Sequence, residues 1–431
     1  MKQTNSRLLA WVLCMGMLSL TGCKRELPPA LQPASQGGAS LSTEGPSQPE
    51  ELIPERGAEL SFRTSDAEFA AAAAKLFEEK YGVKVHTEEG GLYDSQKIAL
   101  EGPSGKGPDV FVSPHDKALE SIQAGLFLKL DDQIVERLSD EVNPVALKTV
   151  TVDGGVYGVP VSIETNVMFY NKALVQGEPA STFEQIAEEA AAYNDPAANK
   201  FWYLMDVSQG SPIYPLLNVY GFNLFGPDGT DEDNPGFDTP EYEKGLEVLR
   251  RYHDLMPISA GDLANVDFLR HQFIDGQTAY LLGGPWDVKT FRDAGVDFGV
   301  TSLPTYDGKQ QRPFAFVQNA HVSAYTQYPV AAQLFAEFLI SSECAELLYA
   351  KAAKITSRAD ISTVAGLSDD EHLRRINEVF VNAVPMPSAR RLSYYWTISS
   401  NVGQAVFNGE MTPAEGAQKS VEYWDAFLAT E

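Results

Sequence analysis

The segment His271–Trp286, HQFIDGQTAYLLGGPW, predicts a helix end, a tight turn, a short strand and a second turn. Gly276 stands where a helix C-cap favours a left-handed residue, and Thr278–Leu282 has the length and apolar composition of a buried strand. The Gly-Gly-Pro sequence that follows ends the strand and presents Trp286 on a rim. Small molecules bind beyond the carboxyl ends of strands in α/β sheets, so this indole is a candidate to stack on an apolar ligand face such as a pyranose ring. The alternative is that Trp286 fills a corner of the fold.

Strands and helices alternate along the chain. Glu59–Thr64 has strand composition, Ser65–Glu68 has the pattern of a capping box, and an alanine-rich helix follows to Tyr81-Gly82. This β-α-β order predicts an α/β protein with an open, largely parallel sheet. Further strands are expected at Val83–Val85, Pro108–Val112 and Tyr157–Val161. Further helix starts are expected at the capping box Ser181–Glu184 and at Thr239-Pro240.

Length, charge and cysteines narrow the class of protein. A chain of 431 residues suggests about two domains. The formal net charge of −26 argues against nucleic acid as a partner, because phosphate binding needs a basic surface. Cys14 and Cys23 lie in the N-terminal region, so Cys344 is the only thiol of the body and is expected to be a buried small hydrophobe.

The N-terminus has the pattern of an export signal. Lys2 and Arg7 precede the apolar run Leu8–Leu20, which is shorter than the roughly 20 residues of a membrane span. Leu20-Thr21-Gly22-Cys23 resembles the lipobox of bacterial lipoproteins, which predicts a signal peptide at residues 1–22 and lipid attachment at Cys23. Residues 23–57 are rich in Pro, Gly, Ser and Gln and are expected to be a flexible tether to the membrane surface. Either membrane leaflet is compatible with this lipid anchor.

Motifs for catalysis, metal binding or cofactor binding are missing from the sequence. It contains no HExxH, no G-x-S-x-G, no Walker loop and no GxGxxG after a strand, so no catalytic residue, metal or cofactor is predicted. The histidines do not have metal-ligand spacing; they are His86, His115, His253, His271, His321 and His372.

Polar and aromatic side chains follow several of the expected strands. Asp116 and Lys117 come just after Pro108–Val112, and Glu164 comes just after Tyr157–Val161. Together with Trp286 and Trp396 they are the residue types that a sugar site uses, with charged groups for hydroxyls and indoles for ring faces. Asp116 and Lys117 could instead form only a local salt bridge. Glu164 lies in an apolar stretch, where burial without a partner would be costly, and this favours a functional role.

Several stretches, in their order and spacing, resemble the maltodextrin-binding family of extracellular solute-binding proteins, the receptors of ATP-driven sugar importers. The resemblance covers about Ala58 to Glu431 and also includes the spacing from Met386-Pro387 to Trp396. The stretches are GPDVFVSPHD (Gly107–Asp116), YGVP with IETNVMFYNKALV up to Val175, STFEQI (Ser181–Ile186), FIDGQTAYLLGGPW, and FGVTSLPTYDG (Phe298–Gly308).

The resemblance implies a two-lobe periplasmic-binding-protein-like fold of type II, with ligand in the cleft between two α/β lobes. The N-lobe would comprise residues 58–161 and about 320–355, and the C-lobe residues 165–314 and about 358–431. The hinge would be crossed near Val161–Thr165, Pro313–Asn319 and Ala353–Ser357. The positions that match sugar-contacting residues of the family are Asp116, Lys117, Glu164, Trp286 and Trp396, with Asp66, Asp94 and Gln209 matched less securely.

Two positions depart from the family pattern. Ser113 and Ser211 stand where the resemblance leads us to expect aromatic residues, which favours a disaccharide or a different sugar over long maltodextrins. The function implied is a monomeric, lipid-anchored extracytoplasmic receptor that delivers a sugar to the permease of an ATP-binding cassette (ABC) importer. The alternatives are an extracytoplasmic carbohydrate-processing enzyme, the same scaffold serving a signalling partner, and a receptor for a solute other than a sugar.

Overall fold

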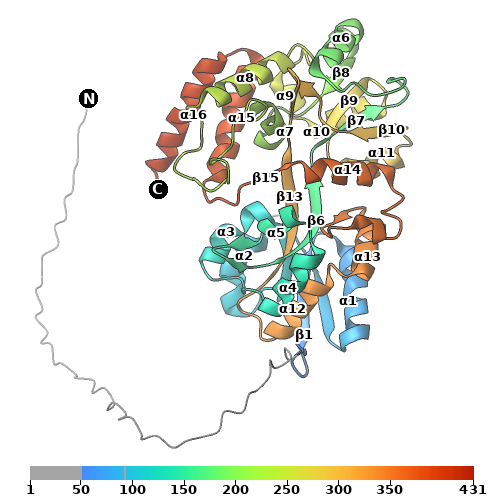
Figure 1. The fold of residues 1–431 in the computed structure, drawn as a ribbon, viewed down its shortest axis with the longest axis vertical. Coiled ribbons are helices and arrows are strands. Elements are labelled where there is room, and N and C mark those ends of the chain that lie inside the picture. Colours follow the sequence, from blue (N-terminus) through green and yellow to red (C-terminus); the bar gives the residue numbers. More distant parts are fainter. Residues whose placement is uncertain (1–50, 92–93) are drawn as a thin grey trace, which may run out of the picture. The chain divides into compact units, whose positions relative to one another are not determined.

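The computed structural model describes residues 51–91 and 94–431. The predicted signal peptide, Cys23 and the tether up to residue 50 lie outside the described residues. Within the described residues, the main strands form two sheets, each surrounded by helices (Figure 1). The two-lobe α/β fold is therefore confirmed, and we call the lobe on the larger sheet the N-lobe and the other the C-lobe. None of the helices in these residues has the length and hydropathy that a membrane span requires.

The N-lobe sheet has the order β14-β6-β13-β3-β1-β2, and β15 also pairs with β13. Its strands are β1 (Glu59–Thr64), β2 (Lys84–Glu89), β3 (Val110–Pro114), β6 (Val159–Thr165), β13 (Phe314–Val322), β14 (Ile355–Thr356) and β15 (Val384–Pro385). β1 is parallel to β2 and β3, but β13 is antiparallel to both β3 and β6. The expectation of a largely parallel sheet is wrong. The sheet is mixed because β13 returns from the C-lobe and runs against the strands that precede it.

The C-lobe sheet has the order β10-β7-β9-β8. Its strands are β7 (Val167–Asn171), β8 (Phe201–Leu204), β9 (Thr278–Gly283) and β10 (Phe298–Thr301). Every residue of β9 is buried, and Gly276 before it has a φ of 68°, which confirms the predicted strand and the left-handed glycine. Outside the two sheets, β4 (Thr151–Val152) pairs with β5 (Gly155–Val156), and β11 (Thr305–Tyr306) pairs with β12 (Lys309–Gln310).

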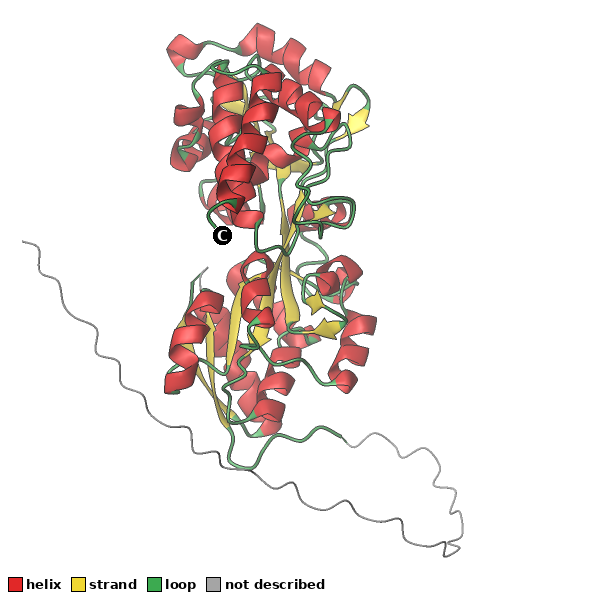
Figure 2. Ribbon diagram, turned by 90° about the vertical axis from the view of Figure 1, so that its left-hand side faces the viewer, coloured by secondary structure: helices red, strands yellow, loops and turns green. Residues whose placement is uncertain are grey.

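The chain passes between the two sheets at the waist of the molecule. Asn166 is the single residue between β6 in the N-lobe sheet and β7 in the C-lobe sheet. β13 carries the chain back and lies beside β6, with Ala315 opposite Thr165 and Ala320 opposite Val159 (Figures 1 and 2). After β14 the chain leaves the N-lobe sheet again. These passages fall at the segments where the sequence predicts the hinge; the exact lobe boundaries stay predictions.

Helices pack around both sheets (Figure 2). In the N-lobe core, the rings of Phe62 and Phe77 each pack edge-on against Phe335 with centroids 5.0 Å apart. The N-lobe helices are α1 (Ala67–Tyr81), α2 (Asp94–Glu101), α3 (Leu119–Gln123), α4 (Asp132–Glu141), α5 (Pro144–Lys148), α12 (Pro329–Phe338) and α13 (Ser342–Ala352). The helices of the C-lobe and the waist are α6 (Phe183–Tyr193), α7 (Gly210–Leu217), α8 (Pro240–Tyr252), α9 (Ala260–Leu263), α10 (Val266–Ile274), α11 (Pro285–Asp293), α14 (Glu371–Val381), α15 (Leu392–Asn408) and α16 (Pro413–Leu428).

Two of the predicted helix caps are displaced by one residue. Helix α1 follows Asp66 rather than Ser65, and the Asp66 carboxylate accepts a hydrogen bond from Lys354 Nζ at 2.7 Å. In α6 the capping box joins Thr182 to Gln185, one residue after the predicted Ser181–Glu184 box. The Asp66 side chain makes no capping hydrogen bond, so α1 lacks the predicted capping box, whereas Thr182 and Gln185 complete one in α6.

Two other local predictions are confirmed. Thr239 caps α8 and Pro240 is its first residue, as the Thr-Pro pair predicts. Cys344 on α13 is fully buried, and burial raises the pKa of its thiol to about 12. Such a thiol stays protonated and behaves as a small apolar side chain.

Candidate ligand-binding site

A hollow of about 470 Å³ lies between the lobes, beyond the carboxyl ends of β3 and β8. Its N-lobe side includes Asp116, which follows β3, and its C-lobe side includes the start of α7, which follows β8. The volume falls within the roughly 300–1,000 Å³ of small-molecule sites. The lining residues are Asp116, Ser208, Gln209, Gly210, Ser211, Phe316, Met386, Trp396, Thr397 and Ser400. We call this hollow the cleft site.

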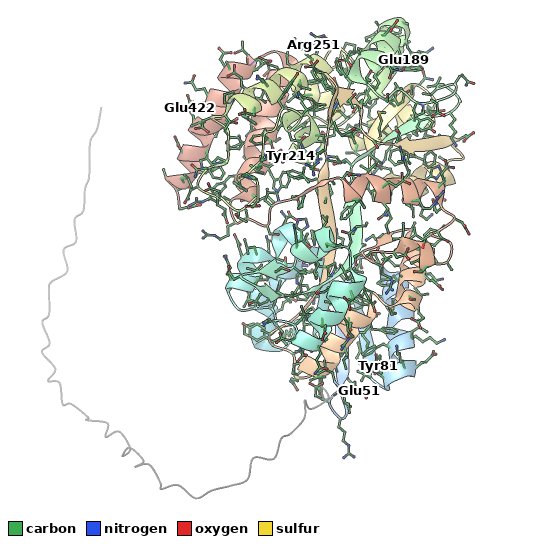
Figure 3. The ribbon with its side chains drawn as sticks, viewed as in Figure 1. Glu51, Tyr81, Glu189, Tyr214, Arg251 and Glu422 are labelled. Carbon is green, nitrogen blue, oxygen red and sulfur yellow. The ribbon has the colours of Figure 1, made fainter. Side chains whose placement is uncertain are left out.

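Aromatic side chains pack against Trp396 and fix its position beside the cleft site. Its ring lies 5.0 Å from Tyr395 and 6.2 Å from Phe314, measured between centroids. Phe314 in turn stacks on Tyr214 at 3.6 Å, and Figure 3 shows Tyr214 in the C-lobe just above the waist. One part of the Trp396 indole is thereby held by the core while another part lines the cleft site. A fixed aromatic surface of this kind suits an apolar ring face of a ligand.

Gly210 lets helix α7 approach Trp396 closely. A Cβ atom at this position would lie 2.9 Å from Trp396 Cε3 and 2.2 Å from Ser399 Oγ, so only glycine fits without a shift of α7 or α15. Tyr395 Oη donates a hydrogen bond to the Gly210 carbonyl at 2.9 Å and fixes the same junction. The cleft wall is therefore a close helix-to-helix contact.

Asp116 and Lys117 form an ion pair at 2.8 Å, and Asp116 also lines the cleft site. The carboxylate is 10% exposed and the ammonium group 25% exposed. A smaller adjoining hollow of about 140 Å³ is lined by both residues and by Trp396. The local salt bridge and the position in the cleft, which the sequence treats as alternatives, thus occur together.

A buried carboxylate holds Gln209 at the N-terminus of α7. Its Nε2 donates to Asp206 Oδ2 at 2.8 Å, while the amide and hydroxyl of Ser208 donate to Asp206 Oδ1 at 2.7 and 2.6 Å. These three hydrogen bonds to the buried Asp206 carboxylate hold the loop that carries Ser208 and Gln209 to the cleft. These side chains supply amide and hydroxyl groups to a ligand.

Glu164 does not lie beyond its strand. Strand β6 continues to Thr165, so Glu164 is within it, opposite Phe316 of β13. It is half-buried, and Gln318 Nε2 donates to its carboxylate at 3.4 Å, so the argument from burial without a partner fails. Phe316, the residue opposite Glu164, lines the cleft site, but Glu164 is not among the described residues that line it.

Three further candidates lie apart from the lining of the cleft site. Asp66 is paired with Lys354, as described above. Asp94 is fully buried, and its carboxylate accepts hydrogen bonds from Lys97 Nζ at 2.8 Å and from the Gly91 amide at 2.7 Å. Trp286 is in the first turn of α11 and is 45% exposed, so it is on the surface, as predicted, rather than in a buried corner.

The two serines that depart from the family pattern occupy different places. Ser211 lines the cleft site and donates to Asn166 Oδ1 at 3.3 Å, so a hydroxyl stands where an aromatic residue was expected. Ser113 is buried on β3, and its Oγ has no hydrogen-bond partner among the described residues. The loss of a stacking surface in the cleft therefore concerns Ser211.

The sequence reasoning missed several lining residues. Phe316 lies inside the predicted hinge segment, and its alternation along β13 could have indicated a side chain at the waist. Ser400 lies four residues after Trp396 and therefore on the same face of α15, whereas Thr397, the next residue after Trp396, lines the cleft from a neighbouring face. Ser208 and Gly210 belong to a loop and a helix start for which the sequence has no comparable signal. Met386 lies in a stretch whose spacing to Trp396 resembles the family, but it was not predicted to line the site.

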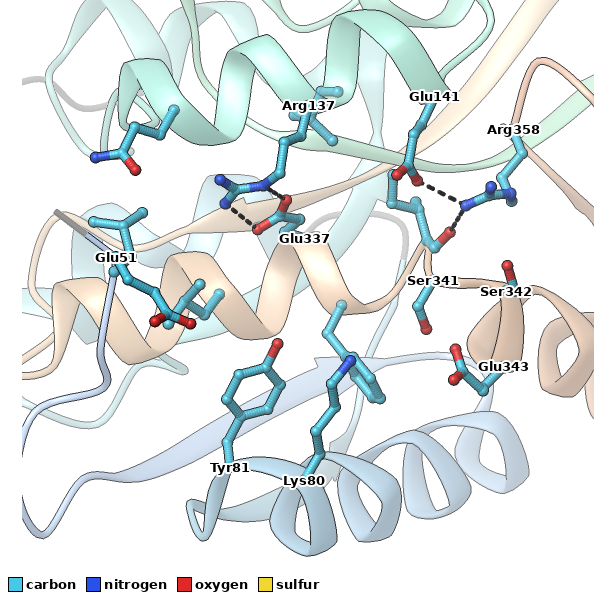
Figure 4. Close-up of a pocket in the computed structure, with 16 residues that line it drawn as sticks. Glu51, Lys80, Tyr81, Arg137, Glu141, Glu337, Ser341, Ser342, Glu343 and Arg358 are labelled. Carbon is cyan, nitrogen blue, oxygen red and sulfur yellow. Dashed lines mark hydrogen bonds and ion pairs between the residues drawn. The ribbon is translucent and has the colours of Figure 1, made fainter. Parts of the chain in front are cut away.

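A second hollow of about 470 Å³ lies in the N-lobe, among helices α1, α4, α12 and α13 (Figure 4). Two ion pairs lie along it, Arg137 with Glu337 at 2.5 Å and Arg358 with Glu141 at 2.8 Å. Glu51, Lys80 and Glu343 also line it. Helix flanks rather than strand ends form its walls. The cleft site, which both lobes line, is therefore the principal candidate for ligand binding.

Comparison with known families gives a match over most of the body. The family model described as bacterial extracellular solute-binding protein matches residues 72–375. The galactooligosaccharide-binding protein of Bacillus subtilis (strain 168) is 26% identical over 358 residues, which are 81% of this chain and 84% of that protein.

Two further proteins agree with this match. A maltooligosaccharide ABC transporter solute-binding lipoprotein of Streptococcus pneumoniae R6 is 28% identical over 81% of this chain and 83% of its own length. Among solved structures, the maltose-binding periplasmic protein of Listeria monocytogenes in complex with maltose is similar with a TM-score of 0.78 at 27% identity. That alignment covers 88% of this chain and 99% of the other.

Proposed function

The chain belongs to the bacterial extracellular solute-binding protein family, and from this we propose that it is a receptor that closes its lobes around a sugar and delivers it to the permease of an ABC importer. The observation that carries the proposal is the cleft site. It combines the aromatic surfaces of Trp396 and Phe316 with the polar groups of Asp116 and Gln209. Aromatic faces pack on the C–H faces of sugar rings, and carboxylates and amides bond to their hydroxyls.

Closure follows from the placement of these groups on both lobes. Asp116 belongs to the N-lobe, whereas Gln209 and Trp396 belong to the C-lobe, so a ligand in the cleft site bridges the two lobes. A ligand that binds the closed form more tightly shifts the hinge equilibrium toward it. The closed receptor is then the form that the permease distinguishes from the empty one.

The sugar that we propose is a short malto-oligosaccharide. The relatives named above bind galacto-oligosaccharides, malto-oligosaccharides or maltose, according to their names. Ser211 gives the cleft a hydroxyl where the sequence comparison leads us to expect an aromatic residue, and this favours a disaccharide such as maltose. A sugar with galactose units is the second candidate.

The remaining features of the proposal concern location and mode of action. We propose that Cys23 carries lipid, that residues 23–50 tether the body outside the cytoplasm, and that the receptor acts as a monomer. The predicted tether to residue 57 is too long, because the Glu55 carboxylate accepts hydrogen bonds from the Val330 and Ala331 amides at the start of α12 and so belongs to the folded body. Of the residues that line the cleft site, Asp116 is engaged by Lys117 at 2.8 Å, so the site favours binding over acid-base chemistry. The protein would then release its sugar unchanged.

Titration calorimetry tests this function. Maltose, maltotriose, maltotetraose and galactobiose are each titrated into the purified body, and the sugar is recovered and analysed by chromatography. We expect saturable binding of at least one sugar and its recovery intact. Hydrolysis of the sugar would favour the enzyme alternative, and heat effects absent for all four would refute the sugar-receptor function.

A further inference from the structure

His115 is a buried residue at the point where strand β3 leaves the N-lobe sheet. It is 1% exposed and begins the short turn that contains Asp116 and Lys117. The last residue pair between β3 and β13 joins Pro114 to Gln318. Beyond that pair, the backbone of β3 turns away from β13.

The turn leaves a gap along one edge of β13. Strand β6 occupies the opposite edge, and β15 pairs with β13 only at Phe314 and Ala315. Among the described strands, neither β3 nor β15 reaches the amide of Val317 on this edge. The His115 ring takes that place: Nδ1 accepts from the Val317 amide at 3.3 Å, and Nε2 bonds to the Met386 carbonyl at 3.1 Å.

These two partners determine the protonation state of the ring. A carbonyl oxygen only accepts, so Nε2 carries the proton, and a backbone amide only donates, so Nδ1 is unprotonated. The ring is therefore neutral. A second proton on Nδ1 would face the Val317 N–H and break that bond.

The three segments that meet at His115 each supply a lining residue of the cleft site. Asp116 is the next residue in the chain, Phe316 precedes Val317, and Met386 is itself a bonding partner. We propose that neutral His115 is a positioning residue that holds Asp116, Phe316 and Met386 together for the ligand. This inference rests on the proposed function, since it concerns the same cleft.

Acid should weaken this arrangement. Burial lowers the pKa of His115, and the nearby charges are Asp116, which opposes the shift, and Lys117, which adds to it; His321 on β13 is the other titratable group acting within this region. Because the folded pKa is below the ordinary value, the neutral ring is complete at neutral pH. Ligand affinity that depends on it is lost as the pH falls through the lowered pKa.

Three variants, assayed with maltotriose by calorimetry between about pH 7.5 and about pH 4.5, test the inference. His115→Phe keeps a ring but removes both bonds, whereas His115→Gln retains a donor and an acceptor and does not titrate. His321→Gln is the matched control, because His321 is also fully buried and is on β13, the strand whose Val317 amide His115 bonds. Thermal unfolding of each variant shows that the assayed protein is folded.

We expect His115→Phe to bind about tenfold or more weakly at neutral pH, and the two glutamine variants to bind within about threefold of the parent. As the pH falls, the parent should lose affinity more steeply than His115→Gln, which contains the same cleft carboxylates. Nitrogen NMR should show Nδ1 unprotonated in the ligand-free protein.

Unchanged affinity in His115→Phe, parallel pH profiles or a proton on Nδ1 would overturn the inference. Failure of the parent to bind any of the sugars refutes the proposed function instead, and the NMR result still judges the ring's role.

Discussion

Replacement of Trp396 by alanine is the sharpest test of the cleft site. The indole is held on one side by Tyr395 and Phe314 and lines the cleft with another side, so the variant removes a prepared stacking surface. Aromatic contacts with a well-filled pocket contribute about 1–3 kcal/mol. Since about 1.4 kcal/mol is a factor of ten, the dissociation constant for maltotriose should rise roughly 5- to 150-fold.

The cost to folding should be smaller than for a core tryptophan. Truncation of a fully buried Trp destabilises a protein by about 3–5 kcal/mol, but Trp396 is only partly buried. Trp424 is the matched control, because it is 3% exposed and packs against Phe225, Phe237 and Tyr394, away from the lining of the cleft site. Trp424→Ala should lower the unfolding free energy by the full amount of about 3–5 kcal/mol, while its folded fraction binds the sugar normally.

Calorimetry and urea unfolding on the two variants separate these effects. We expect Trp396→Ala to lose affinity with a modest loss of unfolding free energy, and Trp424→Ala to show the reverse. Equal destabilisation of both variants, combined with normal sugar binding by folded Trp396→Ala, would refute the assignment of Trp396 to the ligand.

The remaining predictions concern the cleft wall, the rim and the anchor. Gly210→Ala should destabilise the protein by about 1–3 kcal/mol in urea unfolding, since its Cβ would lie 2.2 Å from Ser399 Oγ; an unchanged midpoint would contradict the close contact. Trp286→Ala should leave stability within about 0.5 kcal/mol because the indole is 45% exposed, and a fall in sugar affinity would support its predicted ligand role, whereas equal affinity would remove it. Cys23→Ser should give a protein that no longer partitions into detergent, and mass spectrometry that finds no acyl group on the parent would contradict the lipid anchor.

Local chemistry explains which structural features were predictable. The strand at Thr278–Leu282 was found because an apolar run between a left-handed glycine and a Gly-Pro pair has few other conformations. The predicted Gly-Pro turn was wrong, because Gly284 caps α11 and Pro285 is its first residue. The direction of β13 was not predictable in this way, since it depends on the chain's return from the C-lobe. The helix starts at Asp66 and Thr182 were each missed by one residue: the Asp66 carboxylate bonds to the distant Lys354 and does not cap α1, and Gln185 rather than Glu184 completes the box at α6.

Site residues could be predicted where they lie in a recognisable sequence stretch. They could not be predicted where only the folded structure brings them to the cleft. Asp116, Gln209 and Trp396 come from three distant segments, and the structure brings them to one cleft. Asp94 has a similar polar character, yet its carboxylate is buried and bonded to Gly91 and Lys97. Sequence position shows that a residue follows a strand, but the twist of the sheet and the hinge decide which side chains face the other lobe. The spacing from Met386 to Trp396 resembles the family, but only the folded structure shows that Met386 lines the cleft.

Closure around a sugar is the central claim, and small-angle scattering of the body with and without saturating maltotriose tests it most directly. Ligand at about 100 times its dissociation constant adds roughly 2.7 kcal/mol to the unfolding free energy, and a parallel thermal shift confirms that the site is occupied. We predict a smaller radius of gyration in the occupied protein, because contacts from Asp116 on one lobe and Trp396 on the other pull the lobes together. A thermal shift with an unchanged radius would contradict the account.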